Sequence, residues 1–483
     1  MSIFSDILSR HIAAKSVKPN DMAQYCGLER SFMYKIIKGS RIPASAEPVL
    51  GMAEYLRLTP QEKEDFVEAY KISTEGYDNY FRRKAVLELF ENFEKYSEPE
   101  HLLPPQPLPC LSDSTDTIAV TGKNEIRHLL FHILFLESRR QDAHIRLLIQ
   151  PDSPFLTELL ASIAYRNPTL KMDHIICFNN SEKIGPDKQN YNLFCLKQIL
   201  PLYSCACLYN VYYYYGTLLD STGELLLFPY LILTSTHVFL LARDMQSGII
   251  IKTPEMLSFF RELYEGYLKK VSSLAVRMED VASQIQYFRN LTPVPDHTFS
   301  LQMIPCLTYS IPDHFLERYI LKELPNRDAT IDLVTSHIHR IRKTLEESPL
   351  YFIFSLDGIR RFLKTGRIPE YPESIYRAIE PSDRILLVKR FLRLCPGKYL
   401  KLLRKNIGNI DNELFMYINQ RCGYLMFPSA ESGQLICLDI TEPSLLFAFS
   451  DFCENLDDDL FYPEDEVFGI LSKFLTEEVS RIE

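Results

Sequence analysis

A run of five prolines within eleven residues interrupts this 483-residue chain: Pro99, Pro104, Pro105, Pro107 and Pro109. Proline fixes its own φ angle and lacks a backbone N–H, so such a run disfavours both helix interiors and central strands. Proline-rich segments of this kind are typical of extended, semi-rigid linkers. We therefore expect the chain to divide here into a short N-terminal part and a long body.

The N-terminal part has the apolar spacing of five short helices. We expect them over residues 3–12, 19–26, 30–38, 48–56 and 60–70. Pro19 suits the first turn of the second helix, and Gly27 and Gly39 suit the positions just after the second and third helices. Thr59 is followed three positions later by Glu62, which is the pattern of a capping box at the start of the fifth helix.

The third of these helices is strongly amphipathic. At about 100° per residue, one polar face covers an arc of about 140° and carries Arg30, Ser31, Tyr34, Lys35 and Lys38. The other face is apolar, with Phe32, Met33, Ile36 and Ile37. An α-helix fits the major groove of B-DNA, where Arg and Lys can donate to guanine and Ser can bond either way. The polar face therefore has the chemistry of a DNA-reading surface.

Charge is segregated along the N-terminal part. Residues 10–41 contain seven basic side chains and two acidic ones, whereas residues 42–75 contain three basic and seven acidic side chains. A one-sided basic surface is the electrostatic pattern of phosphate binding. The whole chain has a formal net charge of −10, which argues against a protein that coats nucleic acid without specificity.

Residues 22–43 resemble the Xre/Cro family of phage-repressor helix-turn-helix proteins. The matching features are a small residue at a helix crossing, a tight turn, two buried apolar residues, a terminating glycine and a following Arg-x-Pro. In this sequence they are Ala23, Gly27-Leu28, Met33, Ile36, Gly39 and Arg41-Ile42-Pro43. The junction Leu58-Thr59-Pro60 also fits, so that the resemblance covers residues 5–72.

The resemblance implies an all-α, lambda-repressor-like bundle whose third helix lies in the major groove of double-stranded DNA. Together with the helical face and the charge pattern, it gives four expected base-reading residues: Arg30, Ser31, Tyr34 and Lys35. The expected phosphate contacts are Lys18, Lys38, Ser40 and Arg41. Two positions depart from the family. Glu29 replaces the usual Ser or Thr before the recognition helix and repels phosphate, and Pro19 replaces a Gln that usually contacts phosphate.

The body mixes strands and helices. Before it, the apolar spacing of residues 76–96 predicts a helix, which connects the two parts, forms a dimer contact or docks on the core of its own domain. We expect buried strands over 144–150, 172–178 and 248–252, two strands within 225–241, and helices over 154–164 and 254–270. The stretch 224–242 imitates a membrane span, but Pro229 and a Thr-Ser-Thr-His cluster favour two strands. The N-terminus does not have the pattern of a signal peptide.

Two regions of the body share one order of elements. Residues 228–267 and 413–455 both run strand, turn, strand, Ser-Gly turn, strand and helix. The strand at 144–150 with Asp152 likewise corresponds to the strand at 351–356 with Asp357. We interpret the body as two copies of one α/β unit separated by a helical section at 314–348. In this interpretation Gly248 and Gly433 lie at turns that need positive φ.

No sequence motif of the body indicates catalysis. Nucleotide-binding glycine loops, GxSxG and HExxH are all missing from the sequence. His144, His174 and His237 lie in apolar strands and are interpreted as core residues. The acidic run 457–459 is interpreted as a solvated loop, and the tyrosine run 212–215 as ordinary strand packing. The eleven cysteines form no CxxC pair and are expected to be reduced thiols without zinc.

The expected fold is therefore multidomain: a helix-turn-helix domain (1–73), a connecting helix and linker (74–124), a first α/β unit (125–280), and a helical section with a second α/β unit (281–483). We expect a cytoplasmic, sequence-specific transcriptional regulator that binds double-stranded DNA as a homodimer. We expect no cofactor or metal, no enzymatic activity and no association with membranes. The body would dimerise, sense a small-molecule or peptide effector, or both. The alternatives are a protein-interaction platform with a degenerate helix-turn-helix, and a hydrolase or nucleotide-binding enzyme.

Overall fold

The computed structural model describes residues 2–92, 116–180, 190–205, 207–216, 227–274, 276–277, 281–395, 397–408, 410, 414–428 and 435–482. The proline run 99–109 and Gly433 lie outside these residues. The chain separates into two compact units, one holding the residues up to Ala85 and the other beginning at Val86. Helix α6 (Tyr77–Glu91) begins in the first unit and ends in the second.

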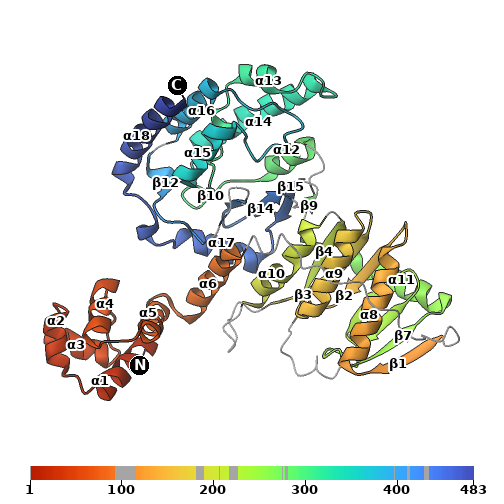
Figure 1. Cartoon of the computed structure of the whole chain (residues 1–483), viewed down its shortest axis with the longest axis horizontal. Helices are drawn as coiled ribbons and strands as arrows, with labels where there is room; N and C mark the ends of the chain where they lie inside the picture. The colour runs from red at the N-terminus through yellow and green to blue at the C-terminus, as the bar shows by residue number, and fades with distance from the viewer. Residues whose placement is uncertain are drawn as a thin grey trace. The chain divides into compact units, whose positions relative to one another are not determined.

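The first unit is a bundle of short helices (Figure 1). They are α1 (Ile3–Ala14), α2 (Pro19–Tyr25), α3 (Arg30–Ile37), α4 (Ala46–Tyr55) and α5 (Pro60–Glu75). The five helices expected from the sequence are thus present at the expected places. They enclose one apolar core that includes Phe4, Leu8, Met22, Met33, Ile36, Val49, Met52 and Phe66.

Local sequence signals set the ends of these helices. Gly27 has φ +64°, and the amide of Leu28 donates to the carbonyl of Ala23 at 2.9 Å, so the chain turns sharply between α2 and α3. The predicted capping box of α5 is confirmed. The Thr59 hydroxyl accepts from the Glu62 amide at 3.3 Å, and the Glu62 carboxylate accepts from the Thr59 amide at 2.9 Å.

The second unit contains two mixed sheets, each covered by helices, which confirms the mixed α/β character of the body. The first sheet has the order β1-β7-β6-β5-β2-β3-β4-β8. Its strands are β1 (Thr117–Thr121), β2 (His144–Leu148), β3 (Lys171–Asn179), β4 (Leu208–Gly216), β5 (Tyr230–Leu233), β6 (Val238–Leu241), β7 (Ser247–Ile251) and β8 (Ser272–Ser273).

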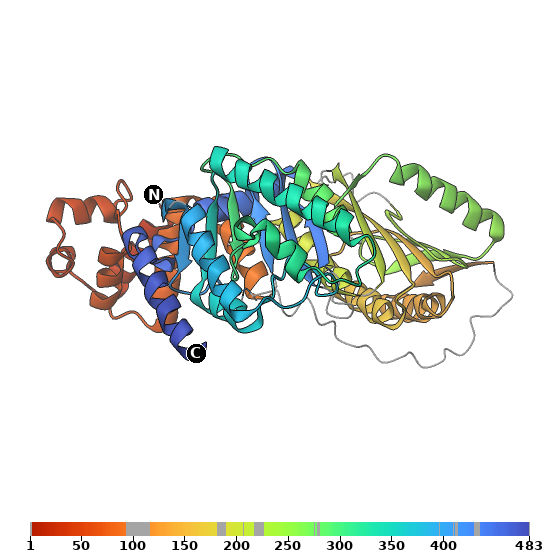
Figure 2. The same cartoon turned by 90° about the horizontal axis from the view of Figure 1, so that it is seen from above.

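Helices cover both faces of the first sheet. Three of them precede or separate the parallel strands: α8 (Lys123–Ser138), α9 (Pro154–Arg166) and α10 (Tyr191–Ser204). Helix α11 (Pro254–Leu268) lies on the opposite face, as Figure 2 shows. Its Leu257 and Tyr264 pack into an apolar cluster with Ile175 and Leu233. The expected strands and helices of this region are confirmed, including two strands, β5 and β6, where the sequence imitates a membrane span.

The second sheet has the order β12-β11-β10-β13-β14-β15-β9. Its strands are β9 (Val276–Arg277), β10 (Phe299–Gln302), β11 (Tyr351–Ser355), β12 (Leu400–Leu403), β13 (Phe415–Ile418), β14 (Gly423–Pro428) and β15 (Leu435–Asp439). Its helices are α12 (Val281–Asn290), α13 (Asp313–Tyr319), α14 (Arg327–Glu347), α15 (Leu356–Thr365), α16 (Pro381–Leu394), α17 (Pro443–Glu454) and α18 (Glu464–Ile482).

The two sheets repeat one topology. In the first, β5, β6 and β7 form an antiparallel meander, β5 pairs antiparallel with β2, and β2, β3 and β4 are parallel. In the second, β13, β14 and β15 form the meander, β13 pairs antiparallel with β10, and β10, β11 and β12 are parallel. The interpretation of the body as two copies of one α/β unit is supported by this strand order.

Three details of the repeat were predicted wrongly. The helical section at 314–348 does not separate the two copies, because it lies between β10 and β11 of the second sheet. The strand at 144–150 is β2, and its topological equivalent in the second sheet is β10. The strand at 351–356, which was predicted to be its equivalent, is β11 and corresponds to β3. Gly248 does not lie at a positive-φ turn. It lies within β7, where a Cβ would come 2.7 Å from a Leu241 methyl and 2.8 Å from the Leu240 carbonyl oxygen. Close approach of the neighbouring strand, and not backbone conformation, is what requires glycine there.

The remaining expectations about the body concern single side chains. His174 is buried, with Nδ1 2.8 Å from the Tyr209 hydroxyl and Nε2 2.8 Å from the Ile149 carbonyl oxygen, so its interpretation as a core residue is confirmed. His144 and His237 are half-buried, and His144 Nε2 lies 2.7 Å from Asp173 Oδ2. The acidic run 457–459 is exposed, and the tyrosine run 212–215 lies in β4.

None of the helices in the described part of the chain combines the length and apolar character that a membrane-spanning helix needs.

Candidate nucleic-acid interface

Helix α3 is held in the first unit by its apolar face. Met33 and Ile36 are fully buried in the core, and Phe32 and Ile37 pack against its edge. Burial of side chains of this size contributes about 1.5–3 kcal/mol each, which fixes the rotation of the helix about its axis. The opposite face must therefore point to solvent.

The residues expected to read DNA bases all lie on that solvent face. Arg30, Ser31, Tyr34 and Lys35 are exposed, and so is Lys38 at the end of the helix. The Arg30 guanidinium lies over the Tyr34 ring, 5.8 Å from its centre, which is an attractive cation–π arrangement. A phenol and a guanidinium thus form one joint surface at the start of α3.

The residues expected to contact phosphate are also exposed: Lys18 before α2, Lys38, and Ser40 and Arg41 in the turn after α3. The hydroxyl of Ser40 donates to the carbonyl of Lys35 at 3.1 Å, and the amide of Ser40 donates to the same carbonyl at 3.0 Å. Ser40 therefore completes the C-terminal end of α3, and its hydroxyl would have to leave Lys35 before it could donate to a phosphate.

The cations of this region differ in whether an acid neutralises them. Lys15 lies 3.4 Å from the Glu62 carboxylate and also donates to the Arg57 carbonyl at 3.1 Å. Hydrogen bonding to the Thr59 backbone, with a contribution from Lys15, lowers the pKa of Glu62 and keeps that carboxylate charged. By contrast, Lys18, Arg30, Lys35, Lys38 and Arg41 have no ion-pair partner among the described residues. A polyanion can therefore neutralise them.

Glu29 is the acid that directly precedes α3. It is the N-cap residue of α3, but its side chain makes no capping hydrogen bond. Instead its carboxylate accepts from the Ser31 hydroxyl at 3.4 Å. A negative charge at a helix N-terminus is favourable in the free protein and unfavourable beside phosphate. The Glu29 carboxylate therefore stabilises α3 in the free protein and lowers the affinity of this surface for an anion.

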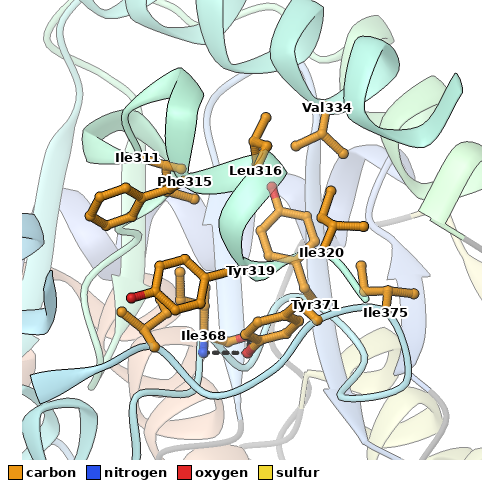
Figure 3. Close-up of a pocket in the computed structure, with 11 residues that line it drawn as sticks. Ile311, Phe315, Leu316, Tyr319, Ile320, Val334, Ile368, Tyr371 and Ile375 are labelled. Atoms are coloured by element: carbon orange, nitrogen blue, oxygen red, sulfur yellow. Dashed lines mark hydrogen bonds between the residues drawn. The ribbon is translucent and has the colours of Figure 1, made fainter. Parts of the chain in front are cut away.

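The body contains an apolar cavity of about 50 Å³ between α13, α14 and the segment that follows α15 (Figure 3). Phe315 and Tyr319 of α13, Val334 of α14 and Ile368 line it. The hydroxyl of Tyr376 accepts from the Ile368 amide at 2.7 Å and donates to the Ile368 carbonyl at 3.0 Å. Because its walls are apolar and the Tyr376 hydroxyl is already hydrogen-bonded, we interpret this cavity as a gap in the packing of the core and not as a reactive site.

A second cavity of the body is lined by buried polar residues that the sequence did not single out, among them Glu370 and His337. Glu370 lies in an irregular segment with Pro369 before it and Pro372 after it, where no periodic pattern predicts burial. The described residues contain no group of three or more His, Cys, Asp or Glu side chains that could hold a metal ion. The ten cysteines within the described ranges are free thiols, and Cys110 lies outside those ranges.

Comparisons with known proteins leave the chain without an assigned family. No protein-family model matches it, and no curated protein matches it. The chain is similar to a solved structure described as TrmBL2, an archaeal chromatin protein that shows a novel mode of DNA binding, with 13% sequence identity. That match covers 55% of this chain and 93% of the other chain at a TM-score of 0.22. A TM-score at this level does not establish a shared fold, so no property of this chain follows from it.

Proposed function

We propose that this protein is a sequence-specific transcriptional regulator of the Xre/Cro type, in which α3 enters the major groove of double-stranded DNA. The single observation that carries the proposal is the arrangement of α3. Its apolar face is locked into the core by Met33 and Ile36, while its other face presents exposed cations that have no ion-pair partner among the described residues. Exposed Arg and Lys on a helix are the side chains that donate to guanine and to phosphate.

In this proposal the residues divide into two roles. Arg30, Ser31, Tyr34 and Lys35 read base edges, because they lie on the central solvent face of α3. Lys18, Lys38, Ser40 and Arg41 flank that face and contact backbone phosphates, which position the helix without carrying sequence information. A single helix reads few base pairs, so the protein binds as a homodimer to two half-sites about 34 Å apart. The body supplies dimerisation, effector sensing, or both.

The test is selection of bound sequences from random double-stranded DNA with the full chain. The proposal expects a motif with two half-sites. Arg30→Ala and Lys35→Ala should each reduce discrimination between bases by about 1–3 kcal/mol per lost bidentate contact. Lys38→Ala should weaken binding to all sequences evenly and lower the salt slope by about one unit.

Lys63→Ala on α5, outside the proposed surface, is the matched control and should change neither discrimination nor salt slope. Equal loss across all sequences for Arg30→Ala would contradict the base-reading role. Failure to enrich any sequence would overturn the proposal and favour a protein-interaction platform with a degenerate helix-turn-helix.

A further inference from the structure

The cavity that holds Glu370 and His337 lies within the second copy of the α/β unit and has a volume of about 90 Å³. Its walls come from α12 and α14, which lie side by side in Figure 1, and from strands β10, β13 and β14. The exposed side chain of Arg340 on α14 lines its outer part, and its guanidinium donates to the Arg289 carbonyl.

Two residues that line this cavity each have a buried polar atom without a hydrogen-bond partner among the described residues: Oε2 of Glu370 and Nδ1 of His337. The Cys306 thiol, a weak donor, also faces the Glu370 carboxyl group. Both side chains are more than nine-tenths buried, with 5% and 4% of their surface exposed. A buried polar group without a partner costs about 1–3 kcal/mol. Two such atoms in the lining of one cavity indicate that a bound molecule completes their hydrogen bonding.

Glu370 is held in place by its other groups. With its amide oriented to satisfy both neighbours, Gln302 donates to Glu370 Oε1 at 2.9 Å. Gln284 of α12 donates to the Glu370 backbone carbonyl at 2.6 Å. Because one carboxylate oxygen and the backbone are fixed, Oε2 is a preorganised acceptor and not a mobile surface group.

Aromatic rings form a wall of the same cavity. Tyr417 and Tyr424 are stacked with their centres 5.7 Å apart and 8° between their planes. Phe288 lies 5.3 Å from Tyr424, and the His337 ring stacks on Phe288 at 6.1 Å. Aromatic faces attract cations, and they do so most strongly where water is excluded. An acceptor beside aromatic walls is the recognition chemistry of an organic cation.

We propose that this cavity is a binding site for a compact organic cation, such as a primary ammonium or guanidinium group, which donates N–H to Glu370 Oε2. A second N–H of the same group donates to His337 Nδ1. A cavity of about 150 Å³ accommodates benzene, so this smaller one takes a head group of a few heavy atoms. The inference gives a site to the effector-sensing part of the proposed function, and its test uses no DNA.

Protonation gives the site a dependence on pH. Burial raises the pKa of Glu370 to about 7, so the carboxylate is mostly ionised at pH 8 and mostly neutral at pH 6. Burial lowers the pKa of His337 to about 4, which leaves it neutral over that range. Arg340 is the cationic residue of the outer wall. The facing thiol and phenols stay neutral because burial raises their pKa: Cys306, Tyr309, Tyr371 and Tyr424. A cation therefore binds about tenfold more tightly at pH 8 than at pH 6.

Isothermal titration calorimetry of the full chain tests the site with ethylammonium and guanidinium as probes. We expect saturable binding at millimolar concentrations at pH 8, about tenfold weaker binding at pH 6, and no binding of tetramethylammonium, which has no N–H. Glu370→Gln keeps the shape of the side chain and should weaken binding at least tenfold. Glu373→Gln is the matched control, because Glu373 is an exposed carboxylate that pairs with Arg367 at 3.4 Å.

Thr344→Ile adds bulk to the cavity wall without changing a titratable group, and it should also weaken binding while the circular dichroism spectrum is unchanged. Equal binding by the wild type and Glu370→Gln would overturn the proposal. So would the lack of saturable binding by either probe at pH 8, which would mean that water alone fills the cavity. Neither result would affect the selection of DNA sequences, so failure of this site and failure of DNA binding are distinguishable.

Discussion

The hydroxyl of Ser31 donates to the carboxylate of Glu29 at 3.4 Å, across the first turn of α3. This bond joins an expected base-reading residue to an acid that would repel a DNA backbone placed against α3. The Glu29 side chain does not cap the helix, and Ser31 is drawn toward the helix N-terminus. The start of α3 thus favours the free protein at the expense of binding to an anion.

Replacing Glu29 by Gln should increase affinity for double-stranded DNA. The change removes one negative charge from the proposed phosphate-facing surface and replaces the carboxylate that accepts from Ser31 with a neutral, weaker acceptor. At separations of several ångströms in water, one unit charge contributes about 0.6 kcal/mol, so we expect about threefold tighter binding at low salt. Fluorescence anisotropy titrations at several salt concentrations measure it. Glu54→Gln, an exposed acid on α4, serves as control. Unchanged or weaker binding by Glu29→Gln would contradict the placement of α3 against DNA.

Replacing Thr59 by Ala should loosen the start of α5. The substitution removes the hydroxyl that accepts from the Glu62 amide, and Glu62 loses its reciprocal partner. Loss of an N-cap costs about 1 kcal/mol. Hydrogen–deuterium exchange of the full chain should show about fivefold faster exchange in a peptide covering the first turn of α5. Thr59→Ser keeps the cap and should exchange like the wild type; equal protection in all three proteins would show that the cap contributes nothing.

Local rules predicted the helices and strands because their causes are local. Pro19, Gly27 and Thr59 mark helix ends through backbone geometry and capping, and the 3.6-residue period placed Met33 and Ile36 inside. The equivalence of β2 with β10 could not be predicted, since strand order is a property of the assembled sheet. Glu370 was missed for a different reason: a carboxylate is rarely buried, so no sequence pattern indicates it.

Replacing Gly358 by Ala should destabilise the second copy of the α/β unit. A Cβ at this first-turn position of α15 would overlap the Met303 carbonyl and come 2.7 Å from the Ile304 amide nitrogen. Both are backbone groups that cannot rotate away, so we expect a loss of about 3 kcal/mol in the free energy of unfolding. Thermal unfolding of the full chain followed by circular dichroism should show a lower midpoint.

Gly266 of α11 provides the matched glycine. A Cβ there meets no atom within 4 Å, so Gly266→Ala should stabilise the helix by about 0.5–1 kcal/mol. Equal shifts of the unfolding midpoint in the same direction for both substitutions would contradict the close approach of α15 to the Met303 backbone.

The stability of the protein should fall as pH rises through the titration of Glu370. Burial raises the pKa of this carboxyl from 4.5 to about 7, so the native state favours the protonated form. The stabilisation is fully present below pH 4.5 and is lost as pH rises through 7. The shift of about 2.5 pH units corresponds to about 3 kcal/mol. His337 has the opposite sign: burial lowers its pKa to about 4, and its contribution is lost as pH falls below 6.5.

Glu370→Gln isolates the carboxyl, because the contribution of His337 is the same in both proteins and cancels in the difference. Gln cannot ionise, so the variant should gain stability relative to the wild type as pH rises from 5 to 8, by up to about 3 kcal/mol. Urea unfolding at pH 5, 6, 7 and 8 measures the difference, and ethylammonium at pH 8 should restore part of the wild type's stability by binding the ionised carboxylate. Parallel stability curves for the two proteins would show that Glu370 reaches water, and the argument from a buried, unsatisfied acceptor would then fail.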